Sequence, residues 1–293
     1  MWLKRQKMTL LFSKNSTLYK TLDPLSKNAK IIMISGLPGV GKSLYINQLH
    51  HISKLNGRNI TVIQWDMARK AFETPEILAR YPLGDGLTHK GVLLAVGLWV
   101  LDAVKEWTET HPDKHDLLLI EAPLLGNRFI ELAKIAPDAA LESVLKSDKF
   151  QVVVPIPSKK LRDNIEKARA KDVPDDVKVW AGAKPSVMLL LWKMVCQIAT
   201  ELGYEKPIDL SVQPPYDPSV YQFVYGKILK HRHFTPLLVD KVFKFELDSE
   251  DELHNLGSLK ATAEAANNYA DRISEKYPTD ADIEARIKEW FST

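Results

Sequence analysis

Residues 31–43 read IIMISGLPGVGKS, and this stretch decides the fold class of the chain. Four apolar residues lead into a loop with three glycines, which ends in Lys42 and Ser43. The loop fits the pattern G-x-x-x-x-G-K-[ST], which requires a strand before it and a helix after it. The apolar run supplies a strand, predicted over 29–35, and the sequence KSLYINQLHHISKL at 42–55 supplies the helix. The stretch therefore predicts a phosphate-binding loop.

The chemistry of this loop follows from its residue types. Glycines allow the backbone to form a nest of N–H groups around one anion, and the following helix adds the positive end of its dipole. Lys42 can reach the β- and γ-phosphates of a nucleotide, and the Ser43 hydroxyl can bind Mg²⁺, so we predict ATP and Mg²⁺ as ligands. A chance glycine-rich turn would rarely match four fixed positions in this context. The predicted nucleotide-binding residues are Gly36, Leu37, Pro38, Gly39, Val40, Gly41, Lys42, Ser43 and Leu44.

Outward from the loop, strand-like and helical stretches alternate. Near-continuous apolar runs suit strands that are buried on both faces of a parallel sheet. They occur at 29–35, 59–64, 116–121, 150–154 and 241–247. Helical patterns separate them at 42–55, 66–80, 88–109, 126–147, 158–171, 184–203 and 218–232. This alternation predicts an α/β fold with a doubly wound, five-stranded parallel sheet.

The chain divides into a core with additions at both ends. We expect an N-terminal extension at 1–28, a core at 29–247 and a C-terminal helical segment at 248–293 that packs on the core. Within the core, basic and polar residues indicate an insertion at about 155–185, and a proline-rich loop followed by a helix indicates a second at about 207–236.

Composition and charge narrow the class of protein. The 293 residues are 45% hydrophobic and 26% charged, which is typical of a globular protein. The net charge of +3 gives no reason to expect a nucleic-acid coat. The single cysteine, Cys196, cannot form an internal disulfide and lies in an apolar run, so we expect a buried thiol and a cytoplasmic location. The apolar stretches at 91–104 and 186–199 are shorter than the roughly 20 residues of a membrane span, so we expect buried helices and no membrane association.

A second group of functional residues follows the second predicted strand. The sequence IQWDMAR ends that strand with Asp66 and Arg69, which are three residues apart on one helical face. Ligands of open α/β sheets bind at the carboxyl ends of the strands, so Asp66 is expected in the crevice of the glycine loop. There it can accept the proton of an attacking hydroxyl, while Arg69 holds the acceptor. Alternatively, Asp66 caps the following helix and Arg69 is a solvated surface residue.

The glycine loop, the Asp-x-x-Arg of Asp66 and Arg69, and a later arginine-bearing segment resemble the P-loop kinase superfamily. That group includes nucleoside monophosphate kinases, polynucleotide 5′-kinases and zeta-toxin-like kinases. The resemblance covers about 29–247, with its sharpest motif at the glycine loop. It implies the strand order 2-3-1-4-5, an acceptor-side role for Asp66 as base or ligand, an acceptor contact by Arg69, and a lid after the fourth strand.

The candidate lid is the segment 157–172, PSKKLRDNIEKARAKD. Arg162 and Arg169 are two helical turns apart and share one face, so they can close over the γ-phosphate. The alternative is a solvated charged helix with an i,i+4 pair between Arg162 and Glu166. The sequence leaves both interpretations open.

Two further candidates follow the third predicted strand, and a third lies later in the chain. Glu121, at the strand end, is predicted to hold Mg²⁺ or to act as a second base. Arg128 is either an acceptor contact or an ordinary first-turn helix residue. The basic cluster at 227–233 ends a predicted helix, where basic residues are common, and it is the one feature that favours a polynucleotide acceptor.

Three function classes remain to be separated. A GTPase would need an Asn-Lys-x-Asp element, and an oligomeric ATPase motor usually has two acids at the end of the third strand, whereas this strand ends Glu-Ala-Pro. We therefore expect an ATP-dependent kinase whose acceptor is a small molecule or nucleotide. The alternatives are a polynucleotide 5′-hydroxyl or toxin-like kinase and a nucleotide-dependent regulatory ATPase. The acceptor and the oligomeric state do not follow from the sequence, because acceptor pockets lie in variable insertions.

Overall fold

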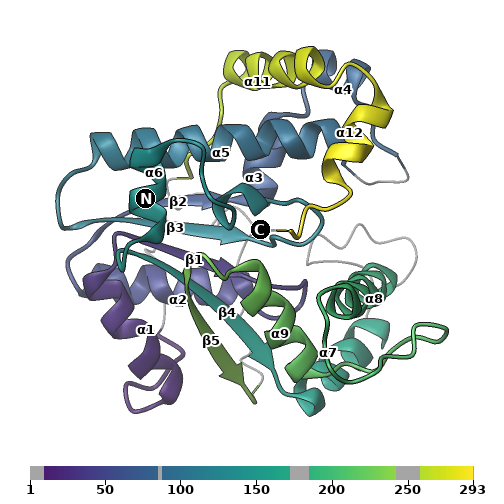
Figure 1. Cartoon of the computed structure of the whole chain (residues 1–293). Helices are drawn as coiled ribbons and strands as arrows, with labels where there is room; N and C mark the ends of the chain where they lie inside the picture. The colour runs from purple at the N-terminus through teal and green to yellow at the C-terminus, as the bar shows by residue number, and fades with distance from the viewer. Residues whose placement is uncertain (1–9, 85–87, 172–184, 242–257, 293) are drawn as a thin grey trace, which may run out of the picture.

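A computed structural model describes residues 10–84, 88–171, 185–241 and 258–292. Five strands form one all-parallel sheet in the order β2-β3-β1-β4-β5 (Figure 1). The strands are β1 Ile31–Ser35, β2 Asn59–Gln64, β3 Asp116–Ala122, β4 Phe150–Pro157 and β5 His233–Val239. The predicted α/β class and strand order are confirmed, and both are compatible with a P-loop NTPase fold.

Helices follow the strands and cover both faces of the sheet. They are α1 Thr17–Asn28, α2 Lys42–Leu55, α3 Trp65–Ala71, α4 Pro75–Arg80, α5 Lys90–Thr110, the 3-10 helix η1 Ile130–Leu132, α6 Ala139–Lys146, α7 Lys159–Lys171, α8 Pro185–Glu201, α9 Pro218–Ile228, α11 Ala263–Lys276 and α12 Asp280–Ile287. In the described part of the chain, none of these helices is long and apolar enough to cross a membrane.

The core consists of two apolar layers, one on each side of the sheet. Successive side chains of a strand point to opposite faces. In β1, Ile32 and Ile34 face the layer that includes α1 and α2, whereas Ile31 and Met33 face the layer that includes α5, α8 and α9. On the outer side of α5, α11 and α12 add a further layer (Figure 1). Within the described residues 258–292, the C-terminal part of the chain contains the helices α11 and α12, and both contact α5.

The fifth strand differs from the prediction. The structure has β5 at His233–Val239, and it takes in the end of the segment 207–236 that the sequence assigns to an insertion. The predicted strand at 241–247 lies almost entirely outside the described residues. A proline at the centre of β5, Pro236, argues against a strand in sequence terms. It is tolerated because β5 is an edge strand, so one side of its backbone needs no ladder partner.

Two predicted helices are shorter than their patterns suggest. The helix predicted at 66–80 breaks into α3 and α4, because Thr74 caps a new helix whose first residue is Pro75. The helix predicted at 126–147 is replaced by a loop, by η1 and by α6, which starts after its N-cap residue Asp138.

The described part of the N-terminal segment, residues 10–28, contributes to the core. Helix α1 packs against α2, and Leu22 is fully buried between them and the sheet. The buried guanidinium of Arg58 donates hydrogen bonds to the carbonyls of Ser26 and Ala29, the latter at 2.7 Å. These bonds attach the end of α1 to the start of β2, at the amino ends of the strands, whereas the glycine loop lies at the carboxyl ends.

Candidate nucleotide and acceptor site

The glycine loop joins β1 to α2 and has the backbone of an anion cradle. Gly36, Gly39 and Gly41 have φ angles of 143°, 82° and 90°, a range that L side chains rarely adopt. Gly41 is the N-cap of α2 and carries no side chain that could cap the helix. The N–H groups of the first turn are therefore oriented for an external acceptor such as a phosphate.

Lys42 and Ser43 begin α2 and reach different partners. The Lys42 ammonium donates to the Leu37 carbonyl at 3.2 Å, within the loop itself. The Ser43 hydroxyl lies 3.3 Å from Oε1 of Glu121 at the end of β3. An ammonium carries three N–H donors, so the contact with Leu37 does not by itself prevent Lys42 from binding a phosphate.

Glu121 is held at the centre of the sheet edge. Its Oε2 accepts a hydrogen bond from Nε2 of Gln64, which pairs with it in the parallel β2–β3 ladder, at 3.4 Å. Burial raises the pKa of Glu121, Lys42 lowers it in part, and the carboxylate of Asp66 raises it further. The glycine-loop lysine and the two predicted acidic residues therefore lie in one electrostatic neighbourhood, as the strand-end argument requires.

The Ser43 hydroxyl and the Glu121 carboxylate fit the predicted Mg²⁺ site. Both are hard oxygen ligands, and Mg²⁺ usually takes one or two protein ligands and completes its shell with water and phosphate. Within the ranges that the structure describes, no group of three or more His, Cys, Asp or Glu residues could form an all-protein metal cage. These two oxygens would suit a metal that takes its remaining ligands from water and phosphate.

Asp66 does not cap helix α3. The N-cap of α3 is Gln64, without a side-chain hydrogen bond to the helix, and Asp66 lies inside the first turn. The Asp66 side chain is exposed and makes no hydrogen bond or ion pair with any residue that the structure describes. The capping interpretation is therefore wrong, and the role of Asp66 as base or ligand stays a prediction.

Two arginines lie near Asp66. Arg69 forms an i,i+4 ion pair with Glu73 and is partly exposed, so it is not the fully solvated residue of the alternative interpretation. Arg128 donates from Nη1 to the Leu125 carbonyl at 3.0 Å. Burial lowers the pKa of Arg128, whereas the carboxylate of Asp66 raises it and the charge of Arg69 lowers it. The three charged groups therefore interact, and Arg128 belongs to the candidate site.

Arg128 lies on a strained loop, not in the first turn of a helix. Leu124, Asn127 and Phe129 have φ angles of 61°, 62° and 63°, and each such residue costs on the order of 1–3 kcal/mol. Leu124 and Arg128 form an antiparallel bridge across the loop. Such strain persists only where the surroundings hold it, and it concentrates at functional sites.

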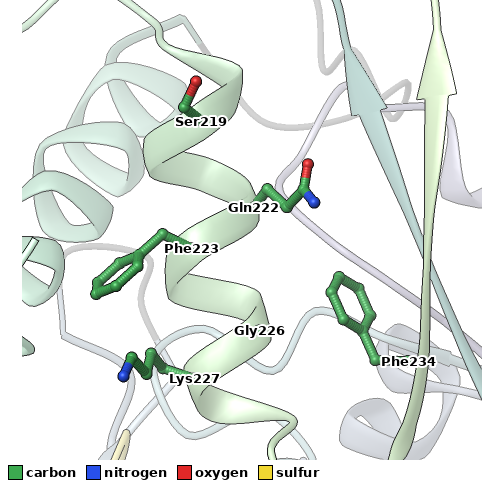
Figure 2. A pocket seen from close by; sticks show the side chains of 6 residues that line it. All are labelled: Ser219, Gln222, Phe223, Gly226, Lys227 and Phe234. Atoms are coloured by element: carbon green, nitrogen blue, oxygen red, sulfur yellow. The ribbon is translucent and has the colours of Figure 1, made fainter.

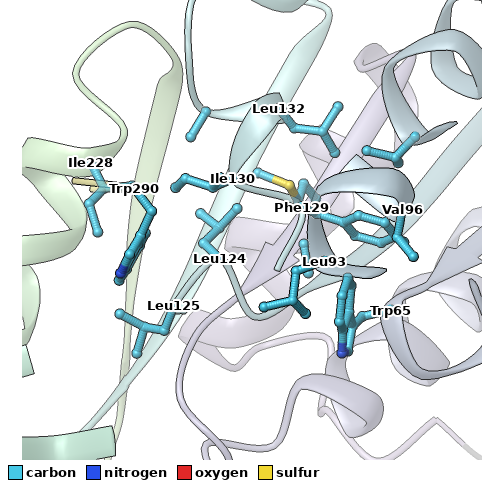
Figure 3. Packing of buried hydrophobic residues seen from close by; sticks show 14 of the residues in the cluster. Trp65, Leu93, Val96, Leu124, Leu125, Phe129, Ile130, Leu132, Ile228 and Trp290 are labelled. Atoms are coloured by element: carbon cyan, nitrogen blue, oxygen red, sulfur yellow. The ribbon is translucent and has the colours of Figure 1, made fainter. Parts of the chain in front are cut away.

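The core holds this loop in place. Figure 3 shows Leu124, Leu125 and Phe129 among buried residues of the larger core cluster, and each of the three is at most 1% exposed. Trp65, next to Asp66, packs edge-on against Phe129 with ring centroids 5.1 Å apart. Trp65 is therefore a core residue that joins the loop after β3 to the start of α3.

The lid candidate Arg162 lies directly on the glycine loop. Its side chain is fully buried, Nη1 donates to the Pro38 carbonyl at 2.9 Å, and Nε donates to Glu166 at 2.6 Å. Its Nη2 atom is also buried and has no hydrogen-bond partner among the described residues. The interpretation of a solvated helix is wrong for Arg162, although the predicted pair with Glu166 exists. Arg169 belongs to α7, but its side chain lies outside what the structure describes.

The basic cluster at 227–233 lies away from the site. Arg232 is buried in an ion pair with Glu142 at 2.9 Å and also donates to the Leu132 carbonyl. His233 is the first residue of β5, so the cluster lies at the amino edge of the parallel sheet. The glycine loop lies at the carboxyl edge. The basic cluster was the one feature that favoured a polynucleotide acceptor. One of its residues, Arg232, is buried in the fold, and the cluster lies at the opposite edge of the sheet from the glycine loop.

An open groove of about 530 Å³ between α9 and β5 is also separate from the site (Figure 2). No residue of the glycine loop lines it. Its lining residues are Ser219, Gln222, Phe223, Gly226, Lys227 and Phe234.

Sequence reasoning missed one direct contact to the glycine loop. The Leu37 N–H donates to the Tyr221 hydroxyl, from α9, at 2.9 Å. Tyr221 and Tyr225 are four residues apart and so share a helical face, which is visible in the sequence. That spacing does not indicate which part of the chain the face contacts.

The chain matches no protein-family model, and searches of curated proteins and of solved structures found no significant match.

Proposed function

We propose that this protein is an ATP-dependent phosphotransferase that acts on a small-molecule or nucleotide acceptor. The observation that carries the proposal is the glycine loop between β1 and α2, whose Ser43 hydroxyl contacts Glu121 while Asp66 and Arg128 lie nearby at the same sheet edge. Phosphoryl transfer depends mainly on positioning and charge neutralisation, and these residue types supply both.

In the proposed reaction, the terminal P–O bond of ATP breaks as a new P–O bond forms to the acceptor oxygen, and ADP leaves. Lys42 and the N–H groups of the loop bind the phosphates. Asp66 orients an acceptor hydroxyl and takes its proton. Ser43 and Glu121 would hold Mg²⁺, which neutralises phosphate charge when it is bound. Arg162 supplies a further cation beside the loop.

The acceptor side favours a ligand with an anionic group. Arg69 and Arg128 interact electrostatically with each other, and both carry guanidinium groups that suit carboxylate or phosphate. A nucleotide or another phosphorylated or carboxylated small molecule fits this pair. A long polynucleotide fits less well, because the basic cluster at 227–233 lies at the opposite sheet edge.

Calorimetric titration of the full chain with ATP and Mg²⁺ tests the proposal. Wild-type protein should bind, and Lys42→Ala should lower the affinity about 100-fold with an unchanged melting temperature, because the lost contact is a charge-assisted hydrogen bond to phosphate. Lys54→Ala removes an exposed lysine from the same helix and is the matched control. Wild-type protein that fails to bind, or a Lys42 variant that binds equally well, would overturn the assignment. Acceptors can then be screened with γ-labelled ATP.

A further inference from the structure

The face of α9 that sequence reasoning missed contacts both halves of the candidate site. The Tyr221 hydroxyl accepts the Leu37 N–H at 2.9 Å, and the Tyr225 hydroxyl donates to the Pro123 carbonyl at 2.9 Å. Pro123 opens the strained loop that carries Arg128. The two phenol rings lie 4.8 Å apart, and their hydroxyls also interact with each other. Helix α9 therefore contacts both the glycine loop and the loop at 123–129, through two side chains that are one helical turn apart.

Tyr221 fits closely against the glycine loop. Its side chain is fully buried. A Cβ atom at Gly36 would lie 2.5 Å from the Tyr221 hydroxyl, which is closer than Cβ atoms come to non-bonded atoms in real structures. Glycine at this position thus serves two purposes, because it permits the φ angle of 143° and leaves room for the phenol.

Leu37 is held from two sides by residues with different tasks. Its N–H is bound by Tyr221, and its carbonyl accepts the Lys42 ammonium at 3.2 Å. If Lys42 turns to a phosphate, the carbonyl loses that contact and the N–H contact remains. Tyr221 then fixes the direction of the loop as it leaves β1, so that the following N–H groups converge on one point.

We propose that Tyr221 is a positioning residue that holds the glycine loop in its phosphate-binding form through the Leu37 N–H. The inference rests on the proposed function, since the loop is taken to bind ATP. A phenol that merely filled the core would contribute to stability alone. A positioning phenol contributes to ligand affinity as well, because a loop that samples other conformations binds less tightly.

The test compares two tyrosine-to-phenylalanine variants that each lose one buried hydroxyl. Tyr221→Phe keeps the ring and removes the acceptor of the Leu37 N–H. Tyr81→Phe is the matched control, because Tyr81 is 4% exposed and its hydroxyl bonds Ser274 at 2.9 Å, in the packing of α4 against α11. For Tyr221→Phe we expect the Kd for ATP–Mg²⁺ to rise about tenfold, or about 1.4 kcal/mol. For Tyr81→Phe we expect the wild-type Kd, even where its melting temperature falls by as much.

Amide hydrogen exchange separates failure of this inference from failure of the proposed function. In the wild-type protein the Leu37 amide should exchange slowly, and in Tyr221→Phe about tenfold faster or more, whether or not ATP binds. Wild-type protein that protects Leu37 but does not bind ATP would overturn the nucleotide assignment alone. An unprotected Leu37 amide in the wild-type protein, or an unchanged Kd in Tyr221→Phe, would overturn the positioning role. If Tyr221→Phe does not fold, the wild-type exchange measurement still tests the contact, because an unprotected Leu37 amide would overturn the positioning role.

Discussion

Replacing Asp66 by asparagine is the sharpest test of how the site works. The change keeps the size and shape of the side chain and removes the charge that could accept a proton. If Asp66 is the acceptor-side base, phosphoryl transfer should fall by roughly 10² or more, the usual range for loss of a general base. The Kd for ATP–Mg²⁺ should stay within about twofold, because in the proposed site Lys42 and the loop N–H groups bind the phosphates.

The structure bounds the other effects of this substitution. Asp66 is exposed and makes no hydrogen bond or ion pair within the described residues, so no buried partner is lost. Its remaining contributions to stability are its charge in the first turn of α3, worth at most about 1 kcal/mol, and two charge interactions of opposite sign, which are favourable with Arg128 and unfavourable with Glu121. For a chain of this size, the melting temperature should therefore fall by less than about 4 °C. A large loss of turnover could not be explained by unfolding.

The assay measures transfer from γ-labelled ATP, with ATP affinity determined on the same preparations. Glu76→Gln is the control, since Glu76 is an exposed acid in the first turn of the neighbouring helix α4. It should share the small loss of stability and keep full turnover. Asp66→Asn protein that turns over at the wild-type rate would refute the role of Asp66 as base. Glu121 would then be the next candidate.

Two other variants test the roles of Arg162 and Glu131. Arg162→Lys keeps the charge but cannot bond both Pro38 and Glu166 as the guanidinium does, so we expect transfer to fall about tenfold; a lower melting temperature with unchanged turnover would indicate a purely structural clamp. Burial raises the pKa of Glu131 to about 7, so the folded protein holds the carboxyl proton more tightly than the unfolded chain does. As the pH rises from about 4.5 to 7, the free energy of unfolding should therefore fall by at most about 3 kcal/mol. Glu131→Gln should therefore raise the melting temperature more at pH 8 than at pH 5, as scanning fluorimetry can measure; an equal change at both values would contradict the assignment.

The parts of the fold that follow from local pattern were predictable. The stretch at 31–43 contains a strand, a loop and a helix start within a few residues, and each has its own signature. The bounds predicted for α2 and β2 equal the observed ones. The strand order did not follow from pattern. It came from the resemblance to P-loop kinases, because periodicity does not indicate which strands are neighbours.

The errors occurred where tertiary context outweighs local preference. Pro236 argues against a strand, but an edge position removes the cost, and edge status is a property of the sheet. The end of the loop at 123–129 was predicted to be the start of a helix over 126–147. Instead, positive φ angles at Leu124, Asn127 and Phe129 are held by burial of the loop in the core. No local signal in the sequence predicts three non-glycine residues in that conformation.

The same distinction explains which site residues were found. Glu121 lies near the carboxyl end of β3, Asp66 lies just beyond β2, and Lys42 ends the glycine loop that follows β1. The rule for parallel sheets therefore brings them to one edge. Tyr221 reaches the loop from a helix 184 residues away along the chain, and only the packed structure reveals it.

The roles that we propose for the two acids rest on their surroundings. Glu121 already accepts hydrogen bonds from Ser43 and Gln64, and burial raises its pKa, so its oxygens are shared before any acceptor arrives. Those hydrogen bonds suit a role for Glu121 in coordinating a metal, because they fix the direction of its carboxylate. Asp66 is exposed and lies on the side of Arg128, where an acceptor with an anionic group would be held. A proton acceptor must be able to approach the incoming hydroxyl and then release its proton to solvent, and Asp66 is the more exposed of the two acids, so we propose it as the base.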